Sequence, residues 1–381
     1  MKTQLRTASV GLAVAALFSS TAVLGQTVVR IGHVAPMTGG IAHLGKDNEN
    51  GAKLAVADLN KAGLTIGGQK VKFELLSEDD AADPKQGTSA AQKLVDAKVA
   101  GVIGHLNSGT TIPASTIYNK AGIPQISPSA TNPRYTLQGY KTAFRVVAND
   151  GQLGGTLGRY AVNELKGKSI AIIDDRTAYG QGVADEFAKG VQAAGGKVVT
   201  RQYTTDKATD FSAILTTIRG RKPDVVFFGG MDAVGGPMLR QMKQLGIDAK
   251  FMGGDGICTS ELPKLAGDAV GNSKVFCAEA GGVVGKFEKK MADFRTRFKA
   301  ETGEEVKLYA PYVYDATMVM VEAMKKANST DPKAYLPELA KIKYEGVTGP
   351  IAFDKNGDIV NGTLTLFTYN GPKRELVKVI Q

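Results

Sequence analysis

Residues 169–203 have the sequence SIAIIDDRTAYGQGVADEFAKGVQAAGGKVVTRQY and contain one strand–helix–strand unit. The short apolar run 169–173 predicts a buried strand, 181–194 predicts a helix, and 197–203 predicts a second strand. Two parallel strands need a long crossover between them, and a helix is the usual crossover. The stretch therefore predicts a βαβ unit in a parallel sheet covered by helices.

The same alternation continues on both sides of this unit. On the C-terminal side we expect helices at 210–219 and 234–245, and strands at 224–228, 251–252 and 274–278. On the N-terminal side we expect strands at 28–34, 71–76, 99–103 and 124–126, and helices at 45–61, from Pro84 onward, and at 108–121. Two series of about five strands each predict an α/β protein with two doubly wound lobes, because one open sheet rarely grows past about ten strands.

The last third of the chain has a different pattern. Helices are expected at 287–301, 312–326 and 332–341, and antiparallel strands at 351–353, 363–369 and 375–380. We expect these elements to complete the two lobes, with the chain crossing between the lobes more than once. Such crossings form a hinge and place a ligand cleft at the carboxyl ends of the strands.

Residues 1–25 have the layout of a secretory signal. Lys2 and Arg6 precede an apolar run at 10–18, and small residues lead up to Gly25. The run is too short to span a bilayer. We expect cleavage before Gln26 and export of the protein; a disordered or anchored N-terminus is the alternative. No cysteine follows the apolar run, so a lipid anchor is not expected.

Charge and cysteine content narrow the function classes. The formal net charge is +10, but the basic residues are spread along the chain, which favours a solvated basic surface over nucleic-acid binding. In an oxidising compartment Cys258 and Cys277 are expected to pair, with two buried thiols as the alternative. The histidines lie far from both cysteines in sequence, so we expect no metal site and no cofactor.

Seven blocks of sequence carry a family resemblance, and they occur in the same order as in the family: DDAADPKQ at 79–86, GHLNS at 104–108, PSAT at 128–131, YGQG at 179–182, FGG at 228–230, FMGGDG at 251–256 and GPIAFD at 349–354. Together they resemble the leucine/isoleucine/valine-binding proteins across essentially the whole mature chain. The resemblance implies the type I periplasmic binding protein fold, with two doubly wound parallel-sheet lobes joined by three crossing strands. The implied first lobe is 26–146 plus 279–353, and the implied second lobe is 147–278 plus 354–381.

The resemblance also implies a function. It predicts a monomeric periplasmic protein, not an enzyme, that closes on a small aliphatic or branched-chain L-amino acid. Its partners would be the permease and ATPase subunits of an ABC importer, and nucleic acid would not be one.

The resemblance assigns one end of the ligand to the first lobe. A buried zwitterion needs partners at both ends. Ser108 is expected to cap a helix whose N-terminus binds the ligand carboxylate. In the loop Ser129-Ala130-Thr131, Thr131 adds a hydroxyl or N–H group, and Ser129 offers a carbonyl to the ammonium. For Ser108 the alternative is a helix cap with no ligand.

The second lobe is expected to hold the other end. Asp255 would pair with the ammonium, at a position where the best-known family members carry glutamate, and Tyr179 would cover the ligand. The alternatives are a turn aspartate and ordinary lobe packing. Leu44 and Met231 replace aromatic residues of the family and would line the side-chain pocket, where an adaptable methionine favours a broader ligand range.

The family disulfide of the first lobe is also missing. It would fall at Ala82 and Asn107. A bridge between Cys258 and Cys277 would therefore lie in the second lobe instead.

Two other functions compete with ligand capture for transport. An enzyme is disfavoured because the glycine pattern at 180–185 lacks a third glycine, 211–213 lacks the glycines of a nucleophile elbow, and no nucleophile–base pair stands out. A periplasmic sensor that reports the same ligand to a signalling partner remains the alternative, since fold does not fix function.

Overall fold

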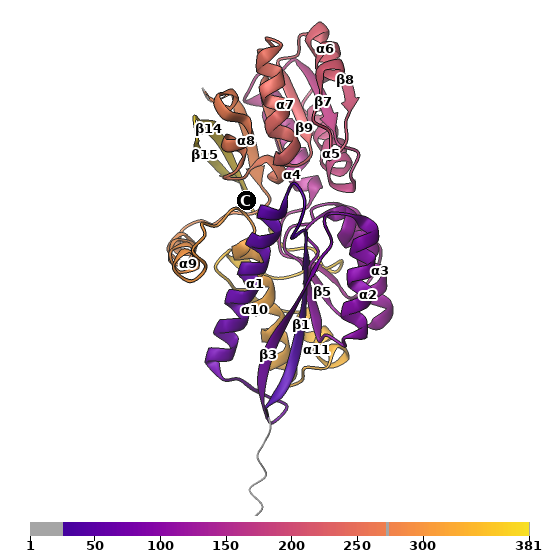
Figure 1. The fold of residues 1–381 in the computed structure, drawn as a ribbon, viewed down its shortest axis with the longest axis vertical. Coiled ribbons are helices and arrows are strands. Elements are labelled where there is room, and N and C mark those ends of the chain that lie inside the picture. Colours follow the sequence, from indigo (N-terminus) through magenta and orange to yellow (C-terminus); the bar gives the residue numbers. More distant parts are fainter. Residues whose placement is uncertain (1–25, 272–273, 381) are drawn as a thin grey trace, which may run out of the picture.

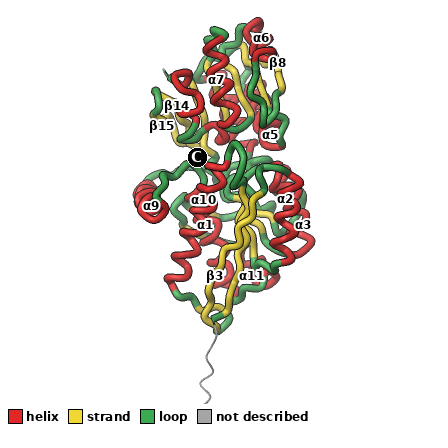
Figure 2. Tube along the Cα trace, viewed as in Figure 1, coloured by secondary structure: helices red, strands yellow, loops and turns green. Residues whose placement is uncertain are grey.

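The computed structural model describes residues 26–271 and 274–380, so the predicted signal peptide at 1–25 lies outside the described residues. Figure 1 shows two lobes stacked along the longest axis of the molecule. Each lobe has strands inside and helices outside (Figure 2). Within the described ranges, no helix combines the length and the apolar character needed to cross a membrane.

The first lobe is built on a six-stranded sheet of order β2-β3-β1-β4-β5-β6. All its neighbouring strands run parallel except β2 and β3. Helices α1 and α10 pack together on one face, and α2 and α3 pack together on the other (Figure 1). The strands are β1 (Thr27–Ala35), β2 (Thr65–Ile66), β3 (Gln69–Asp79), β4 (Gly101–Gly104), β5 (Gln125–Ser127) and β6 (Ala143–Arg145). The helices are α1 (Ala42–Ala62), α2 (Pro84–Asp96), α3 (Ser108–Ala121), α9 (Lys286–Thr302), α10 (Ala310–Ala327) and α11 (Pro332–Leu339).

The second lobe is built on a seven-stranded sheet of order β15-β14-β11-β10-β9-β7-β8. Its central strands are parallel, and β14 and β15 are added antiparallel at one edge. The strands are β7 (Ser169–Asp174), β8 (Lys197–Tyr203), β9 (Val225–Gly229), β10 (Lys250–Gly253), β11 (Val275–Glu279), β14 (Leu364–Asn370) and β15 (Lys373–Ile380). The helices are α4 (Asp150–Asn163), α5 (Ala178–Ala193), α6 (Ser212–Arg221), α7 (Asp232–Gln244) and α8 (Leu262–Ala266).

Three segments connect the lobes, after β6, after β11 and before β14. The first two meet where the backbone N–H of Ala148 donates to the carbonyl of Ala280 at 2.9 Å. The third contacts the first where Arg145 N–H donates to the Gly357 carbonyl at 2.9 Å. Before this third crossing, β12 (Tyr344–Glu345) and β13 (Pro350–Ile351) form a short separate hairpin, so the strand expected at 351–353 is reduced to two residues.

Helix α4 was not expected from the sequence, because it contains four glycines and glycine weakens helices. Its contact with α5 explains two of them. A side chain at Gly154 would come within 2.6 Å of the Val183 carbonyl, and one at Gly158 within 2.3 Å of the Phe187 carbonyl. The glycines therefore allow the two helices to pack backbone against backbone.

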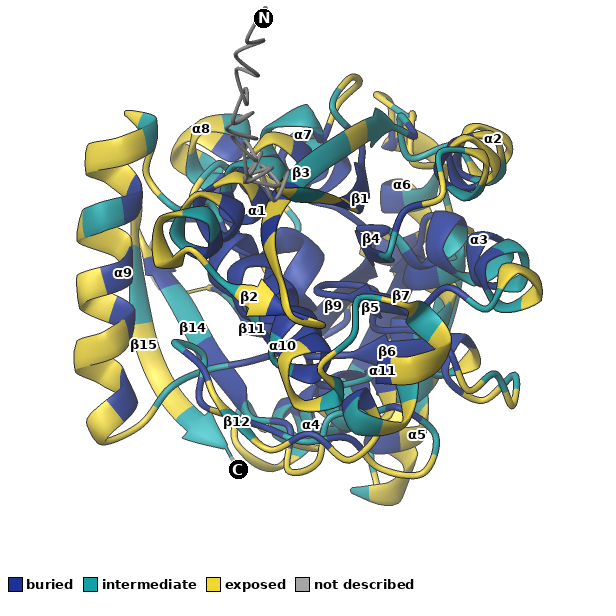
Figure 3. Cartoon of the chain, turned by 90° about the horizontal axis from the view of Figure 1, so that it is seen from below, coloured by how far each residue is buried: buried dark blue, intermediate teal, exposed yellow. Residues whose placement is uncertain are grey.

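The burial of residues follows the layered arrangement of sheets inside and helices outside. The strands at the centre of both lobes are buried, whereas α9 exposes most of one side to solvent (Figure 3). Helix α9 packs its buried phenylalanines, Phe294 and Phe298, against α1 and α10. The two sheets face each other across the hinge, with the carboxyl ends of their parallel strands toward the space between the lobes.

Candidate functional site

A small pocket lies between the two lobes, with about 200 Å³ of empty space. Residues at strand ends and helix starts of both lobes form its wall: Leu106, Asn107, Ser108, Ser129, Tyr179, Met231, Asp255 and Tyr309. Five of these were predicted from the sequence, whereas Leu106, Asn107 and Tyr309 were not.

The first wall is the N-terminus of α3, directly after β4. The N-cap residue is Asn107, whose side chain makes no capping hydrogen bond, so the expectation that Ser108 caps this helix is wrong. Ser108 is instead the first helical residue, and its hydroxyl oxygen accepts a hydrogen bond of 3.2 Å from the backbone N–H of Asn132. The first N–H groups of a helix have no partner within it and favour an anion.

The loop after β5 forms the next part of the wall. The Ser129 hydroxyl donates to the Leu106 carbonyl at 2.9 Å, which ties this loop to the one before α3. The fully buried Arg145 donates to the carbonyls of Ala130 and Asn132 at 3.0 and 2.9 Å. Ala130 and Thr131, which were also predicted to contact the ligand, are buried and do not line the pocket.

The second lobe contributes Asp255, in the turn that follows β10. Asp255 is 1% exposed, and its carboxylate accepts a hydrogen bond of 2.8 Å from the hydroxyl of Tyr179. The same hydroxyl accepts a bond of 3.0 Å from the backbone N–H of Gly256. Burial raises the pKa of Asp255 to about 6, although the hydrogen bonds from Tyr179 and Tyr309 act to lower it.

Tyr309 is a site residue that the sequence reasoning missed. It immediately precedes α10 of the first lobe, and its hydroxyl donates to the second oxygen of Asp255 at 2.8 Å. Its backbone is fixed by the buried Asp47 of α1, whose carboxylate accepts four backbone N–H groups from the loop 307–310. Nothing in the local sequence distinguishes Tyr309 from a core tyrosine at a helix start.

Asp150, the first residue of α4, is fully buried near the loop after β5 and does not line the pocket. Its backbone N–H donates to the Thr131 carbonyl at 2.8 Å. Neither of its carboxylate oxygens, nor the Thr131 hydroxyl, has a hydrogen-bond partner among the described residues. Burial raises the pKa of Asp150 well above its ordinary value, and the charge of Asp255 adds to the rise, while the nearby Thr131 hydroxyl opposes it.

The two residues predicted to line the pocket for the ligand side chain lie in different places. Met231 lines the pocket directly before α7. Leu44 is fully buried in the core of the first lobe and does not line the pocket. Its neighbour His43 instead faces the second lobe, with Nε2 at 2.9 Å from the carboxylate of Asp232.

The predicted cysteine pair is joined. Cys258 and Cys277 form a disulfide with Cα atoms 5.3 Å apart. The backbone N–H of Cys258 donates to the carbonyl of Asp255 at 2.9 Å. The bridge therefore ties the turn that carries Asp255 to the neighbouring strand β11.

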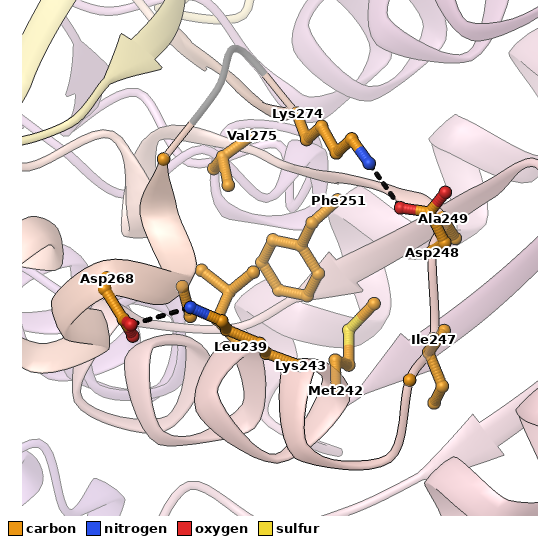
Figure 4. A pocket seen from close by; sticks show the side chains of 13 residues that line it. Leu239, Met242, Lys243, Ile247, Asp248, Ala249, Phe251, Asp268, Lys274 and Val275 are labelled. Atoms are coloured by element: carbon orange, nitrogen blue, oxygen red, sulfur yellow. Dashed lines mark hydrogen bonds and ion pairs between the residues drawn. The ribbon is translucent and has the colours of Figure 1, made fainter.

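A further cavity lies on the second lobe at the amino ends of β10 and β11 (Figure 4). Two exposed ion pairs lie beside it, Lys243 with Asp268 and Lys274 with Asp248. None of the predicted ligand residues lines this cavity. Ligands of open α/β sheets bind at the carboxyl ends of the strands, so the pocket between the lobes is the better candidate site.

Comparisons with known proteins identify the family of the chain. A profile of the periplasmic binding protein family matches residues 28–373. The chain is 38% identical to the Leu/Ile/Val-binding protein homolog 1 of Brucella abortus over 87% of each chain. It is 34% identical to the leucine-, isoleucine-, valine-, threonine- and alanine-binding protein of Pseudomonas aeruginosa, covering 93% of this chain and 92% of the other.

One solved structure extends the comparison to three dimensions. The branched-chain amino acid transporter substrate binding protein of Streptococcus pneumoniae, in complex with isoleucine, superposes with a TM-score of 0.81 at 27% identity. The match covers 92% of this chain and 99% of that one.

Proposed function

Because this chain belongs to the periplasmic binding protein family, a family of solute-binding proteins and not of enzymes, we propose that it captures a small aliphatic L-amino acid and delivers it to an ABC importer. The observation that carries the proposal is the environment of Asp255. This carboxylate is fully buried in the pocket between the lobes, and its hydrogen-bond partners are the neutral hydroxyls of Tyr179 and Tyr309. A ligand ammonium group is the counter-charge that suits it.

The proposed carboxylate site lies opposite, at the start of α3. The N–H groups at Ser108 and Gly109 and the positive end of the helix dipole favour an anion. Thr131 would support the carboxylate end, and Ser129 would accept from the ammonium through its carbonyl. Each lobe alone then satisfies only part of the zwitterion, so a bound ligand favours the closed arrangement of the lobes.

The remaining parts of the proposal rest on the sequence pattern and on the family resemblance. The mature protein is an exported monomer that starts at Gln26, with a first lobe of 26–146 plus 279–353 and a second lobe of 147–278 plus 354–381. The permease and ATPase subunits of the importer would recognise the closed form. Relatives named for leucine, isoleucine and valine support an aliphatic ligand.

Calorimetric titration of the mature chain with leucine, isoleucine, valine, threonine and alanine tests the proposal. Asp255→Ala should weaken the best ligand by about 2–5 kcal/mol, because it leaves a buried ammonium without its counter-charge. Ser108→Ala should cost about 1–2 kcal/mol, since backbone N–H groups still hold the carboxylate. Asp248→Ala, on the exposed far end of the same lobe, is the control. Wild-type affinity in Asp255→Ala would show that the ammonium lies elsewhere.

A further inference from the structure

A second, larger cavity adjoins the proposed ligand pocket. It opens to solvent between the lobes and spans about 1450 Å³ of empty space, the open solvent at its mouth included. Asn107, Tyr179 and Met231 line both this outer cavity and the small pocket. The two spaces therefore meet at these three side chains.

Met231 is the movable part of this boundary. It is 9% exposed, and its sulfur lies against Gly256, where an added side chain would come within 2.8 Å of it. Gly256 in turn bonds to the Tyr179 hydroxyl in the proposed ammonium site. A methionine side chain is unbranched and has three rotatable bonds, so it can move aside for a passing alkyl chain and still contact it.

The walls beyond Met231 leave room for such a chain. Gly39, Gly40 and Ile41 of the first lobe face the outer cavity, as do Ala178 and Ala233 of the second. These side chains are small or apolar. The charged residues of the cavity wall include Arg176, Asp206 and Lys207, and all three are exposed to solvent. The wall also includes the buried Asp175, one carboxylate oxygen of which accepts hydrogen bonds from the N–H group and the hydroxyl of Thr177. An apolar chain that enters the cavity would therefore lie along its small and apolar side chains.

We infer that the side chain of the bound amino acid passes Met231 into the outer cavity, so that the site selects α-amino acids with long, unbranched alkyl side chains. The inference rests on the proposed function, since the zwitterion must first be held at Ser108 and Asp255. Branched isomers place more volume inside the small pocket, whereas a linear chain places its added methylenes beyond Met231. Each buried methylene should then raise affinity about fourfold, the value of removing one methylene from water.

Calorimetry with a ligand series tests this: alanine, 2-aminobutyrate, norvaline, norleucine and 2-aminoheptanoate, with valine and leucine as branched isomers. We expect affinity to rise about fourfold per methylene through 2-aminoheptanoate. Affinity that is highest for valine or leucine and falls for the longer linear ligands would overturn the inference and leave the proposed function standing. If no member of the series binds, the proposed function fails and the inference fails with it.

Variants of residues that line the outer cavity test whether the ligand side chain enters it. Ala178→Phe fills the outer cavity beside Tyr179 and should weaken 2-aminoheptanoate at least tenfold while alanine binding stays within twofold. Ala193→Phe, on the exposed end of the same helix, is the matched control and should change neither. Thr205→Trp narrows the same cavity from an exposed loop and gives a second test if Ala178→Phe does not fold. Equal losses for alanine and 2-aminoheptanoate in the cavity variants would overturn the inference.

Discussion

The hydroxyl of Tyr309 in the first lobe donates a 2.8 Å hydrogen bond to the carboxylate of Asp255 in the second lobe. The bond crosses the space between the lobes and exists only when they are close together. It couples lobe closure to the protonation state of Asp255, the carboxylate that we propose as the partner of the ligand ammonium.

Tyr309→Phe should therefore weaken the binding of the best amino-acid ligand about tenfold or more, because a hydrogen bond to a charged group contributes about 1.5–3 kcal/mol. Tyr314→Phe, in the helix that follows Tyr309, is a matched control. Its hydroxyl donates to Asp58 at 2.7 Å, so it also removes a tyrosine–aspartate bond, but one within the first lobe. Equal calorimetric affinities for the Tyr309 and Tyr314 variants would contradict a role for Tyr309 in closure.

Ligand affinity should depend on the pH through Asp255. Burial raises its pKa from 3.8 to about 6, so between these values the ligand-free native state binds a proton that the unfolded chain releases. This group therefore favours the native state below pH 3.8, and that contribution is lost as the pH rises through 6. A bound ammonium reverses the preference by stabilising the ionised carboxylate. Affinity should consequently fall as the pH drops below 6 and stay constant above it.

Titrations at several pH values, in two buffers of different ionisation enthalpy, measure the proton released on binding. The Asp255→Asn variant should bind the ligand weakly. The loss of affinity below pH 6 that comes from protonation of Asp255 should be absent in this variant. A wild-type affinity that does not change between pH 5 and pH 8 would exclude Asp255 as the ammonium partner.

A second contact between the lobes should respond to pH on its own. Burial lowers the pKa of His43, but the hydrogen bond and charge of Asp232 and the charge of Glu261 outweigh burial and the charge of Lys307, so the net pKa is raised. Protonated His43 therefore favours closure below pH 6.5, and this contribution is lost as the pH rises through the raised value. We expect the pair of His43 and Asp232 to stabilise the closed state by about 1 kcal/mol, since the pair is partly exposed.

Small-angle scattering of the ligand-free protein at pH 6 and pH 8.5 measures this effect. The wild type should become more open at the higher pH. The His43→Gln variant keeps a hydrogen-bond donor but cannot titrate. At pH 6 it should therefore already be as open as the wild type is at pH 8.5. Identical profiles for both proteins at both values would show that His43 has no part in closure.

Most elements of the fold could be predicted because their signals are local. The predicted bounds of α3 and β8 agree with the structure, and Asp83 caps α2 by accepting from the N–H groups of Lys85 and Gln86. Helix α4 could not be predicted because its glycines serve a contact with α5, which is distant in sequence. The two-lobe architecture followed from the alternation of strands and helices.

The candidate site was less predictable, because its contacts join distant segments. Ser108 and Asp255 stand at strand ends, where a ligand residue is expected. Tyr309 reaches the site only because Asp47, more than two hundred residues earlier, fixes its backbone. Leu44 was placed in the pocket by resemblance alone, yet the orientation of α1 turns it into the core and turns His43 toward the second lobe.

The disulfide should stabilise the second lobe. Cys258 and Cys277 are 19 positions apart, and closing a loop of that size contributes about 3 kcal/mol by the entropy of the unfolded chain. A double variant with serine at both positions should unfold at a lower urea concentration, and reductant should shift the wild type toward the same midpoint. Reductant should leave the double variant unchanged. Equal midpoints for the oxidised wild type and the double variant would contradict this prediction.

The fully buried Arg145 should stabilise both the hinge and the ligand loop. Its Nε donates to Asp358 on the third crossing at 3.0 Å, and the same guanidinium holds the carbonyls of Ala130 and Asn132. Arg145→Met leaves Asp358 without its counter-charge and should cost about 3–5 kcal/mol in urea unfolding. It should also weaken the best ligand, because the loop at Ser129 loses its support. Asp358→Leu added to Arg145→Met should recover part of the stability but not the affinity. If Arg145→Met alone unfolds at the wild-type urea concentration, the ion pair of Arg145 with Asp358 does not stabilise the hinge.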